Sequence, residues 1–220
     1  MPLKETAMTD NQQEIKIIPL AAEHAREVAK LHIEGIGTGF ISSLGVNFVT
    51  ALYKAIAESR ESFGYVAIKD SKVVGFATFT QDVNKLYKSI IRTSGIKFSF
   101  LLLRKMFSWN AIRRIFETLF YPKRIERLQL PEAEFLSMVV SPEARGYGLA
   151  TRFVKTGFHE CACRGIKELK ILAAVSIGPI NKMYEKFGFK VRTQMESHGI
   201  VSNIYVVPTD CFDNSHSGPA

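Results

Sequence analysis

The alternation of apolar and polar residues predicts a β-α-α-β-β order over the first 80 residues of the chain. Residues 14–19, EIKIIP, have the two-residue period of a strand and end in proline. Residues 21–34 and 43–59 carry apolar side chains three or four positions apart, which predicts a pair of packed helices. Residues 65–69 and 73–80 are apolar and contain β-branched side chains, and the polar segment between them predicts a hairpin.

Strands and helices alternate again from residue 134 onward. Residues 134–140, EFLSMVV, predict a strand covered on both faces, followed by a glycine-containing turn and a helix over 148–164. A strand at 168–175, a short helix at 180–186 and a hairpin of 189–194 with 200–207 complete the pattern. Together these elements predict an α/β (α+β) fold with a mixed central sheet of about six to seven strands flanked by helices.

A basic segment rich in apolar residues, 84–130, separates the two halves. It contains eleven lysines and arginines against two glutamates, a net charge of +9, whereas the whole chain has a net charge of +8. The rest of the chain is therefore close to neutral. Apolar residues recur three to four positions apart within the segment, which predicts a helical insertion of two or three amphipathic helices. An anionic partner is expected to meet the protein here.

The composition fits one domain. Of the 220 residues, 46% are hydrophobic and 23% are charged, as in ordinary globular domains. We expect a single domain over 14–207 that includes the insertion at 84–130, with polar tails at 1–13 and 208–220. The first residues resemble neither a secretory signal nor an anchor, and three cysteines are too few for a disulfide framework, so we expect a cytoplasmic protein. The cysteine spacing does not fit zinc, and no metal is expected.

The most informative segment joins the strand at 134–140 to the helix at 148–164. It reads SPEARGYGLA over 141–150. Its glycines lack Cβ, so successive backbone N–H groups can close around an anion at the start of the helix. Arg145 adds positive charge, and pyrophosphate is the expected ligand. A tight turn without a ligand is the alternative. A dinucleotide-binding βαβ unit fits less well, because the third glycine of its fingerprint is missing.

Two motifs in this half of the chain resemble those of a known superfamily. Arg145-x-x-Gly148-x-Ala150 resembles the Arg/Gln-x-x-Gly-x-Gly/Ala signature of the GNAT N-acetyltransferases, which binds the coenzyme A pyrophosphate. Residues 181–189, NKMYEKFGF, resemble the superfamily's Tyr-x-Lys-x-Gly-Phe segment. The element order over residues 15–205 also matches a GNAT core. The resemblance implies a GNAT fold, acetyl-CoA as the cofactor, and transfer of its acetyl group to an amine.

The resemblance also implies which residues bind the cofactor. Many relatives have an asparagine seven residues before the motif tyrosine, where this chain has Ile177. Asn181, three residues before the tyrosine, is expected to supply that polar contact instead. The expected cofactor-binding residues are Val139, Val140, Arg145, Gly146, Tyr147, Gly148, Leu149, Ala150 and Asn181.

Direct transfer of the acetyl group needs a base for the amine and an acid for the departing thiolate. Tyr184 is the predicted acid, and its alternative role is packing only. Glu134 matches the position of a catalytic glutamate in some relatives, and a solvated carboxylate is the equal alternative; Glu132 and Glu34 are rival bases. A backbone N–H at 139–140, beside an expected strand bulge, is predicted to stabilise the oxyanion.

Candidate contacts to the acceptor come from two places. The stretch from His32 to Phe40, followed by Ser-Leu-Gly at 43–45, resembles a bacterial GNAT subgroup often associated with surface-sugar pathways. His32, Glu34 and Phe40 are therefore candidates, although a lone histidine on a helix is more often structural. Arg113 and Arg114 are candidates for holding an anionic acceptor. The expected acceptor is a small-molecule amine, with amino sugars and nucleotide sugars the first class to consider.

Several alternatives stay open. The basic segment is equally suited to a solvated surface, and peripheral contact with an anionic membrane is a further alternative. Nucleic acid is not an expected partner, because the chain contains no recognised binding motif. A homodimer is left open. For the whole protein, the alternative to an enzyme is a non-catalytic acyl-CoA-binding regulatory module.

Overall fold

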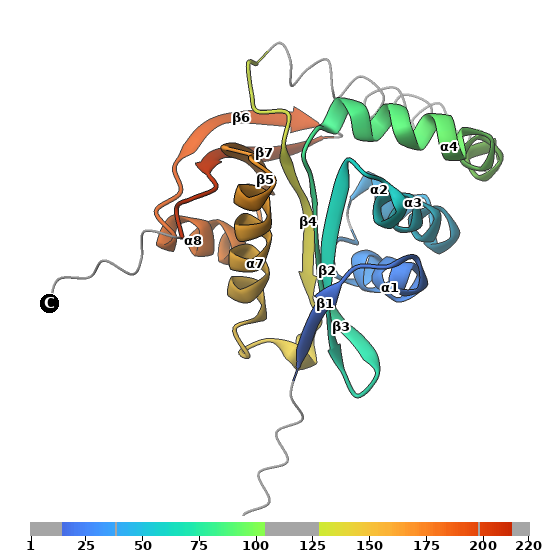
Figure 1. Cartoon of the computed structure of the whole chain (residues 1–220), viewed down its shortest axis with the longest axis horizontal. Coiled ribbons are helices and arrows are strands. Elements are labelled where there is room, and N and C mark those ends of the chain that lie inside the picture. Colours follow the sequence, from blue (N-terminus) through green and yellow to red (C-terminus); the bar gives the residue numbers. More distant parts are fainter. Residues whose placement is uncertain (1–14, 38, 104–127, 198, 213–220) are drawn as a thin grey trace, which may run out of the picture.

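The computed structural model describes residues 15–37, 39–103, 128–197 and 199–212, which form a sheet with helices on both faces (Figure 1). The strands are β1 (Lys16–Pro19), β2 (Ser62–Lys69), β3 (Lys72–Thr80), β4 (Glu134–Val140), β5 (Glu168–Ala174), β6 (Val191–Ser197) and β7 (Ile200–Pro208). The helices are α1 (Ala25–Gly35), α2 (Phe40–Ser43), α3 (Val46–Glu58), α4 (Val83–Leu103), α7 (Leu149–Cys163) and α8 (Gly178–Lys186), with short 3₁₀ turns at Ala22–His24 and Pro142–Ala144.

The sheet has seven strands in the order β1-β2-β3-β4-β5-β7-β6. Only one of the described neighbouring pairs, β4 with β5, is parallel; the others are antiparallel. The predicted mixed sheet of six to seven strands flanked by helices is confirmed. The hairpin expected between 65–69 and 73–80 is also present, with Asp70 and Ser71 at positive φ in its turn.

The two faces of the sheet bury separate cores. Helices α1 and α3 cover one face, where Val28, Val49 and Phe76 are fully buried. Helix α7 covers the other face, where Phe153 and Phe158 are fully buried. Figure 1 shows these helices on opposite sides of the edge-on sheet. Strands β3 and β4 lie between the two cores, which explains why their sequences are almost uniformly apolar.

Glycines let two helices approach the sheet closely. A Cβ on Gly157 of α7 would lie 2.0 Å from the ring of Phe79 on β3. A Cβ on Gly35, at the end of α1, would lie 2.5 Å from Cγ1 of Val139 on β4. Real Cβ atoms do not approach other atoms this closely, so a larger residue at either position would force the helix away from the sheet.

Some boundaries differ from the sequence-based expectations. The helix expected over 43–59 begins at Val46 as α3, and a separate short helix, α2, ends at Ser43, because Gly45 adopts a φ of +89° between them. Helix α4 is one of the two or three helices expected in the insertion, and residues 104–127 lie outside the described part of the chain. No helix in the described part is long and apolar enough to span a bilayer.

Candidate functional site

The largest feature of the site is an opening in the sheet between β4 and β5. Among described residues, the two strands form only two ladder pairs, Glu134 with Lys170 and Phe135 with Ile171. Beyond these pairs the strands separate around a cavity of about 790 Å³. The cavity is lined by the rest of β4, by α8 on one side and by the end of α1 with α2 on the other. The backbone edge of β4 that faces β5 is therefore open to a ligand from residue 136 onward, whereas the other edge pairs with β3.

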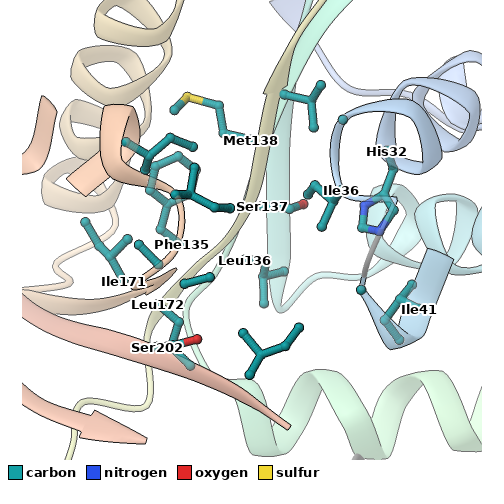
Figure 2. A pocket seen from close by; sticks show the side chains of 18 of the residues that line it. His32, Ile36, Ile41, Phe135, Leu136, Ser137, Met138, Ile171, Leu172 and Ser202 are labelled. Carbon is teal, nitrogen blue, oxygen red and sulfur yellow. The ribbon is translucent and has the colours of Figure 1, made fainter. Parts of the chain in front are cut away.

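A bulge in β4 lies at the start of this opening. Phe135 pairs with Phe79 of β3 and Ser137 pairs with Thr78, which leaves Leu136 as the extra residue. The bulge was expected at 139–140, and that position is wrong. The register with β3 sets the position of the bulge, and no glycine marks it in the sequence. In Figure 2, Ser137 points toward the wall that contains His32, whereas Phe135 and Met138 point toward the opposite side.

The turn after β4 has the geometry expected of an anion-binding loop. Gly146 has a φ of +85° and Gly148 a φ of +70°, which are left-handed conformations that favour glycine. Gly148 immediately precedes α7, so the positive end of that fifteen-residue helix faces the turn. Arg145 is exposed at this turn, and its Nε donates to the Val140 carbonyl at 3.4 Å. Arg145 and Ala150 both line the cavity.

Other residues of the predicted cofactor set contribute differently. The Leu149 side chain is 1% exposed in the core beneath the turn, so it can offer only backbone groups. Tyr147 is 55% exposed, and Lys69 Nζ lies 5.4 Å from the centre of its ring. Hydrogen bonding and the positive charges of Lys69 and Lys72 lower the pKa of Glu143. The β2–β3 hairpin thus adds two cations beside the turn, which the sequence analysis did not assign to the site.

Tyr184 lies on the α8 side of the cavity. It is 4% exposed, with its ring 5.9 Å from that of Phe189 and 5.4 Å from that of Tyr205. Burial raises the pKa of Tyr184 above its usual value, so the phenol keeps its proton at neutral pH. The side chain therefore packs in the core and lines the cavity at once.

The Asn181 side-chain amide forms four hydrogen bonds within the protein. Its Nδ2 donates to the carbonyls of Ala174 and Ile177, each at 2.9 Å. Its Oδ1 accepts from Asn203 Nδ2 at 3.0 Å and from the Tyr205 hydroxyl at 2.8 Å. These four bonds use every donor and acceptor position of the amide. The side chain therefore fixes the start of α8 to β5 and β7 rather than presenting a free group to a cofactor, contrary to the expected polar contact.

Glu134 is buried and ion-paired. It is 8% exposed and lines the cavity, and its Oε2 lies 3.4 Å from Nζ of Lys170, whose side chain is fully buried. Lys170 Nζ also donates to the carbonyls of Pro131 at 2.6 Å and Glu132 at 3.2 Å. Burial lowers the pKa of Lys170, and the neighbouring carboxylate opposes that effect. Glu134 is thus not the solvated strand-end carboxylate that was one alternative.

The acceptor-side candidates separate into two groups. His32 and Phe40 are buried and line the cavity together with Tyr87 of α4, which the sequence analysis missed. Glu34 and Glu132 are exposed and are not among the residues that line this cavity. Arg113 and Arg114 lie outside the described residues.

Polar side chains connect His32 to β4. His32 Nδ1 lies 2.7 Å from the Tyr53 hydroxyl, which lies 2.9 Å from Ser137 Oγ, and Ser137 Oγ lies 2.8 Å from Thr78 Oγ1. His32 Nε2 is buried, and no described residue is its hydrogen-bond partner. Burial lowers the pKa of His32 from 6.5 to about 4, so the imidazole is neutral at physiological pH.

Comparison with protein-family models gives a match to the acetyltransferase (GNAT) family over residues 38–189, which contain the turn at 141–150, Tyr184 and most of the cavity. The chain belongs to the GNAT acetyltransferase family. It is therefore a GNAT-type acetyltransferase. Comparison with curated protein sequences gave no significant match.

Solved structures share the fold of this acetyltransferase at low sequence identity. An N-acetyltransferase from Staphylococcus aureus Mu50 has a TM-score of 0.57 and 15% identity over 89% of this chain and 99% of its own. Arabidopsis thaliana NAA60 in complex with acetyl-CoA has a TM-score of 0.57 and 11% identity over 89% and 98%. Mutant forms of the spermidine/spermine N-acetyltransferase SpeG from Vibrio cholerae have a TM-score of 0.54 and 12% identity over 92% and 100%.

Proposed function

We propose that this acetyltransferase transfers the acetyl group of acetyl-CoA to the primary amine of a small molecule, by direct attack of the amine on the thioester. The observation that carries the proposal is the open edge of β4. This edge leads from the glycine turn to the buried Tyr184, within one cavity. Residues for the donor and residues for the acceptor line opposite sides of the same strand, as a direct transfer requires.

The donor side fits the chemistry of coenzyme A. The backbone N–H groups of 145–150, the positive end of α7 and the Arg145 guanidinium suit a pyrophosphate. The unpaired edge of β4 suits an extended chain that adds to the sheet as a strand would. We assign Val139 and Val140 to this edge. A backbone N–H in this part of β4 would stabilise the oxyanion.

Two side chains are proposed to move protons. Tyr184 is the acid for the leaving thiolate, because its phenol is protonated at neutral pH and lines the cavity. Glu134 is the base, acting through water. Its Oε2 lies 3.4 Å from Lys170 Nζ, and the carboxylate lines the cavity.

The acceptor is proposed to enter between α2, α4 and β4. Described residues on this side are mainly apolar, among them Ile36, Phe40 and Ile41, and the described part of the basic segment contributes Tyr87 rather than a cation. An amino sugar or nucleotide sugar is the first class to test, and a role for Arg113 and Arg114 in holding its anionic group stays a prediction. The exposed cations and apolar residues of α4 also support peripheral contact with an anionic membrane.

A thiol-release assay tests the proposal. Purified protein with acetyl-CoA is offered a panel of amino sugars, nucleotide amino sugars, polyamines and peptides. We expect turnover on one acceptor class. In Tyr184→Phe, we expect kcat to fall about 100-fold while the KM for acetyl-CoA changes little, because general acid catalysis typically contributes factors of this order. An unchanged kcat would remove Tyr184 from the mechanism.

The same experiment distinguishes the non-catalytic alternative. If acetyl-CoA raises the melting temperature but no acceptor of any class is turned over, the protein is a coenzyme-A-binding module and the proposed function is wrong. If acetyl-CoA causes no thermal shift, the assignment of the cavity and the turn to the donor is wrong as well.

A further inference from the structure

The acceptor wall of the cavity, formed by Ile36, Phe40 and Ile41, is apolar. Ile36 directly follows α1, and the other two residues belong to α2. In Figure 2, Ile36 and Ile41 lie on the same side of β4 as His32, whereas Ile171 of β5 lies on the other side. The proposed donor site, at the glycine turn and α8, is on the side of β5 (Figure 1). The acceptor wall is therefore the surface on which the rest of the acceptor molecule would lie.

The polar side chains that line the cavity offer few partners to a hydroxylated acceptor. Among the described lining residues there is no aspartate, asparagine, glutamine or lysine, and the one arginine, Arg145, belongs to the glycine turn. Hydroxyl groups come from serines and tyrosines, and Ser137 already bonds to Tyr53 and Thr78 within the protein. A hydroxyl group that leaves water without finding partners is bound poorly. The ring hydroxyls of a sugar would meet this difficulty.

The charge on the acceptor side of the cavity suits an ammonium group. Glu134 is the single acidic residue among those described as lining the cavity. Burial and the negative charge of Glu134 raise the pKa of Tyr87, so the aromatic ring from α4 lies near the carboxylate from β4. Lys170, which pairs with Glu134, is fully buried and is not among the described lining residues. An amine is protonated at neutral pH before it reacts, and both a carboxylate and an aromatic ring attract a cation.

We propose, on the basis of the proposed function, that the acceptor is a primary amine whose amino group is attached to an alkyl or aryl body that packs on the acceptor wall, rather than to a hydroxylated sugar ring. Apolar groups gain free energy when they leave water for such a wall, whereas hydroxyl groups without partners lose it. An amino sugar, the class suggested by the sequence, is then the poorer substrate.

The bonding changes are those of an ordinary acyl transfer. The amine nitrogen forms a bond to the acetyl carbon, the C–S bond breaks, the nitrogen loses one proton to the base, and the sulfur gains one from the acid. The body of the acceptor takes no part in these changes. Its burial therefore shows in the kcat/KM for the amine, while the KM for acetyl-CoA stays the same.

Two matched sets of amines test the proposal in the full-length protein. Linear primary amines from propylamine to hexylamine differ in length but hardly in basicity, so their kcat/KM reports on burial of the chain. Cyclohexylamine and glucosamine each have a primary amine on a six-membered ring, and only glucosamine has ring hydroxyls. A third arm replaces acetyl-CoA with hexanoyl-CoA, because an apolar wall could also hold a longer acyl chain of the donor.

A pair of variants tests the location of the apolar surface. Ile41→Ser makes the acceptor wall more polar. Ile18→Ser is the control, because Ile18 is a 37% exposed isoleucine on β1 that is not among the residues lining the cavity. The readout is the ratio of kcat/KM for hexylamine to that for propylamine, since partial unfolding lowers both rates alike.

We expect kcat/KM to rise about fourfold for each methylene, or about 60-fold from propylamine to hexylamine, which is the factor expected for burial of each CH₂ group. Cyclohexylamine should react about tenfold or more faster than glucosamine, whose hydroxyls lose their water. In Ile41→Ser the hexylamine-to-propylamine ratio should fall about fivefold or more, and in Ile18→Ser it should match wild type.

Other outcomes separate this inference from the proposed function. Equal kcat/KM across the linear series, or turnover confined to amino sugars, polyamines or peptides, would overturn the inference and leave the proposed function intact. An unchanged ratio in Ile41→Ser would overturn the assignment of the acceptor body to this wall. Faster reaction of propylamine with hexanoyl-CoA than with acetyl-CoA would assign the wall to the donor's acyl chain instead. A protein that binds acetyl-CoA but acetylates no amine of any class would overturn the proposed function, and this inference with it.

Discussion

At the scale of single residues, burial lowers the pKa of two basic side chains near the cavity, Lys170 and His32. Lys170 is fully buried, yet all three of its N–H donors have oxygen partners, two of them carbonyls and one a carboxylate. Within the part of the chain that the structure describes, His32 has one hydrogen-bond partner, at Nδ1, and none at Nε2. Burial lowers the pKa of both, because a charge in the protein interior loses its hydration. Lys170 nevertheless forms an ion pair with Glu134. The His32 imidazole is neutral at physiological pH.

The lowered pKa of His32 predicts an acid-dependent loss of stability. The unfolded chain binds a proton at this site below pH 6.5, whereas the folded protein does so only below about pH 4. The stabilisation is therefore complete above pH 6.5 and is lost as the pH falls through about 4, where the loss reaches roughly 3 kcal/mol. Denaturant unfolding at pH 7, 5 and 4 should show a steeper loss for wild type than for His32→Asn. Parallel pH profiles would contradict this assignment.

At the scale of elements, the turn between β4 and α7 combines a left-handed backbone, which its glycines allow, with the start of a helix. Its two glycines have positive φ, and α7 begins directly after Gly148. Other elements near the site are positioned by contacts that no motif marks. Asn181 ties α8 to β5 and β7, and Arg152 of α7 donates to the Ile15 carbonyl beside β1.

Gly148→Ala should weaken acetyl-CoA binding specifically. An alanine at a φ of +70° is strained by about 1–2 kcal/mol, and relief of that strain would disturb the N–H groups of the turn. We expect a higher KM for acetyl-CoA and an unchanged KM for the amine. Gly165→Ala is the matched control, since Gly165 has a φ of +75° just beyond the other end of α7. If both variants bind acetyl-CoA alike, the conformation of Gly148 is not what binds the donor.

Gly157→Ala should separate α7 from the sheet. The new methyl group would lie 2.0 Å from the Phe79 ring, so α7 must shift, at a cost of about 1–3 kcal/mol in the free energy of unfolding. Gly95→Ala in α4 is the control. The nearest atom to its Cβ would be 3.8 Å away, and alanine favours helix, so its stability should rise slightly. Thermal unfolding compares the two. A melting temperature of Gly157→Ala at or above that of wild type would contradict the close packing.

At the scale of the whole molecule, the described lysines and arginines of the basic segment, 84–130, lie away from the cavity that is the candidate active site. The chain has a net charge of +8, and the basic segment accounts for all of it. The described cations of that segment, including Lys88 and Arg92, are exposed on α4 rather than in the cavity. Near its end, α4 also exposes Ile96 at 91% and Phe100 at 68%. Exposed apolar residues beside cations suit the surface of an anionic membrane.

We therefore expect the full-length protein to float with vesicles that contain anionic lipid, and not with neutral vesicles, at low salt. Binding should weaken as salt is raised, because exposed charges are screened. The double variant Ile96→Ser/Phe100→Ser keeps the net charge, and it should float several-fold less if the apolar side chains insert. Equal flotation of the variant and wild type would limit the contact to charge. No flotation of wild type would leave α4 as a solvated surface.

The sequence by itself determined the element order, the mixed sheet and the family, because each depends on local periodicity or on residues close together in the chain. The ligand of the glycine turn and the role of Tyr184 stay predictions. It did not determine the bulge at Leu136, which depends on pairing with a strand more than fifty residues away. Nor did it show that Lys170 pairs with Glu134, that Asn181 has no free group, or that Tyr53 links His32 to Ser137. Those facts depend on which buried polar atoms find partners across elements, and only the tertiary structure decides that.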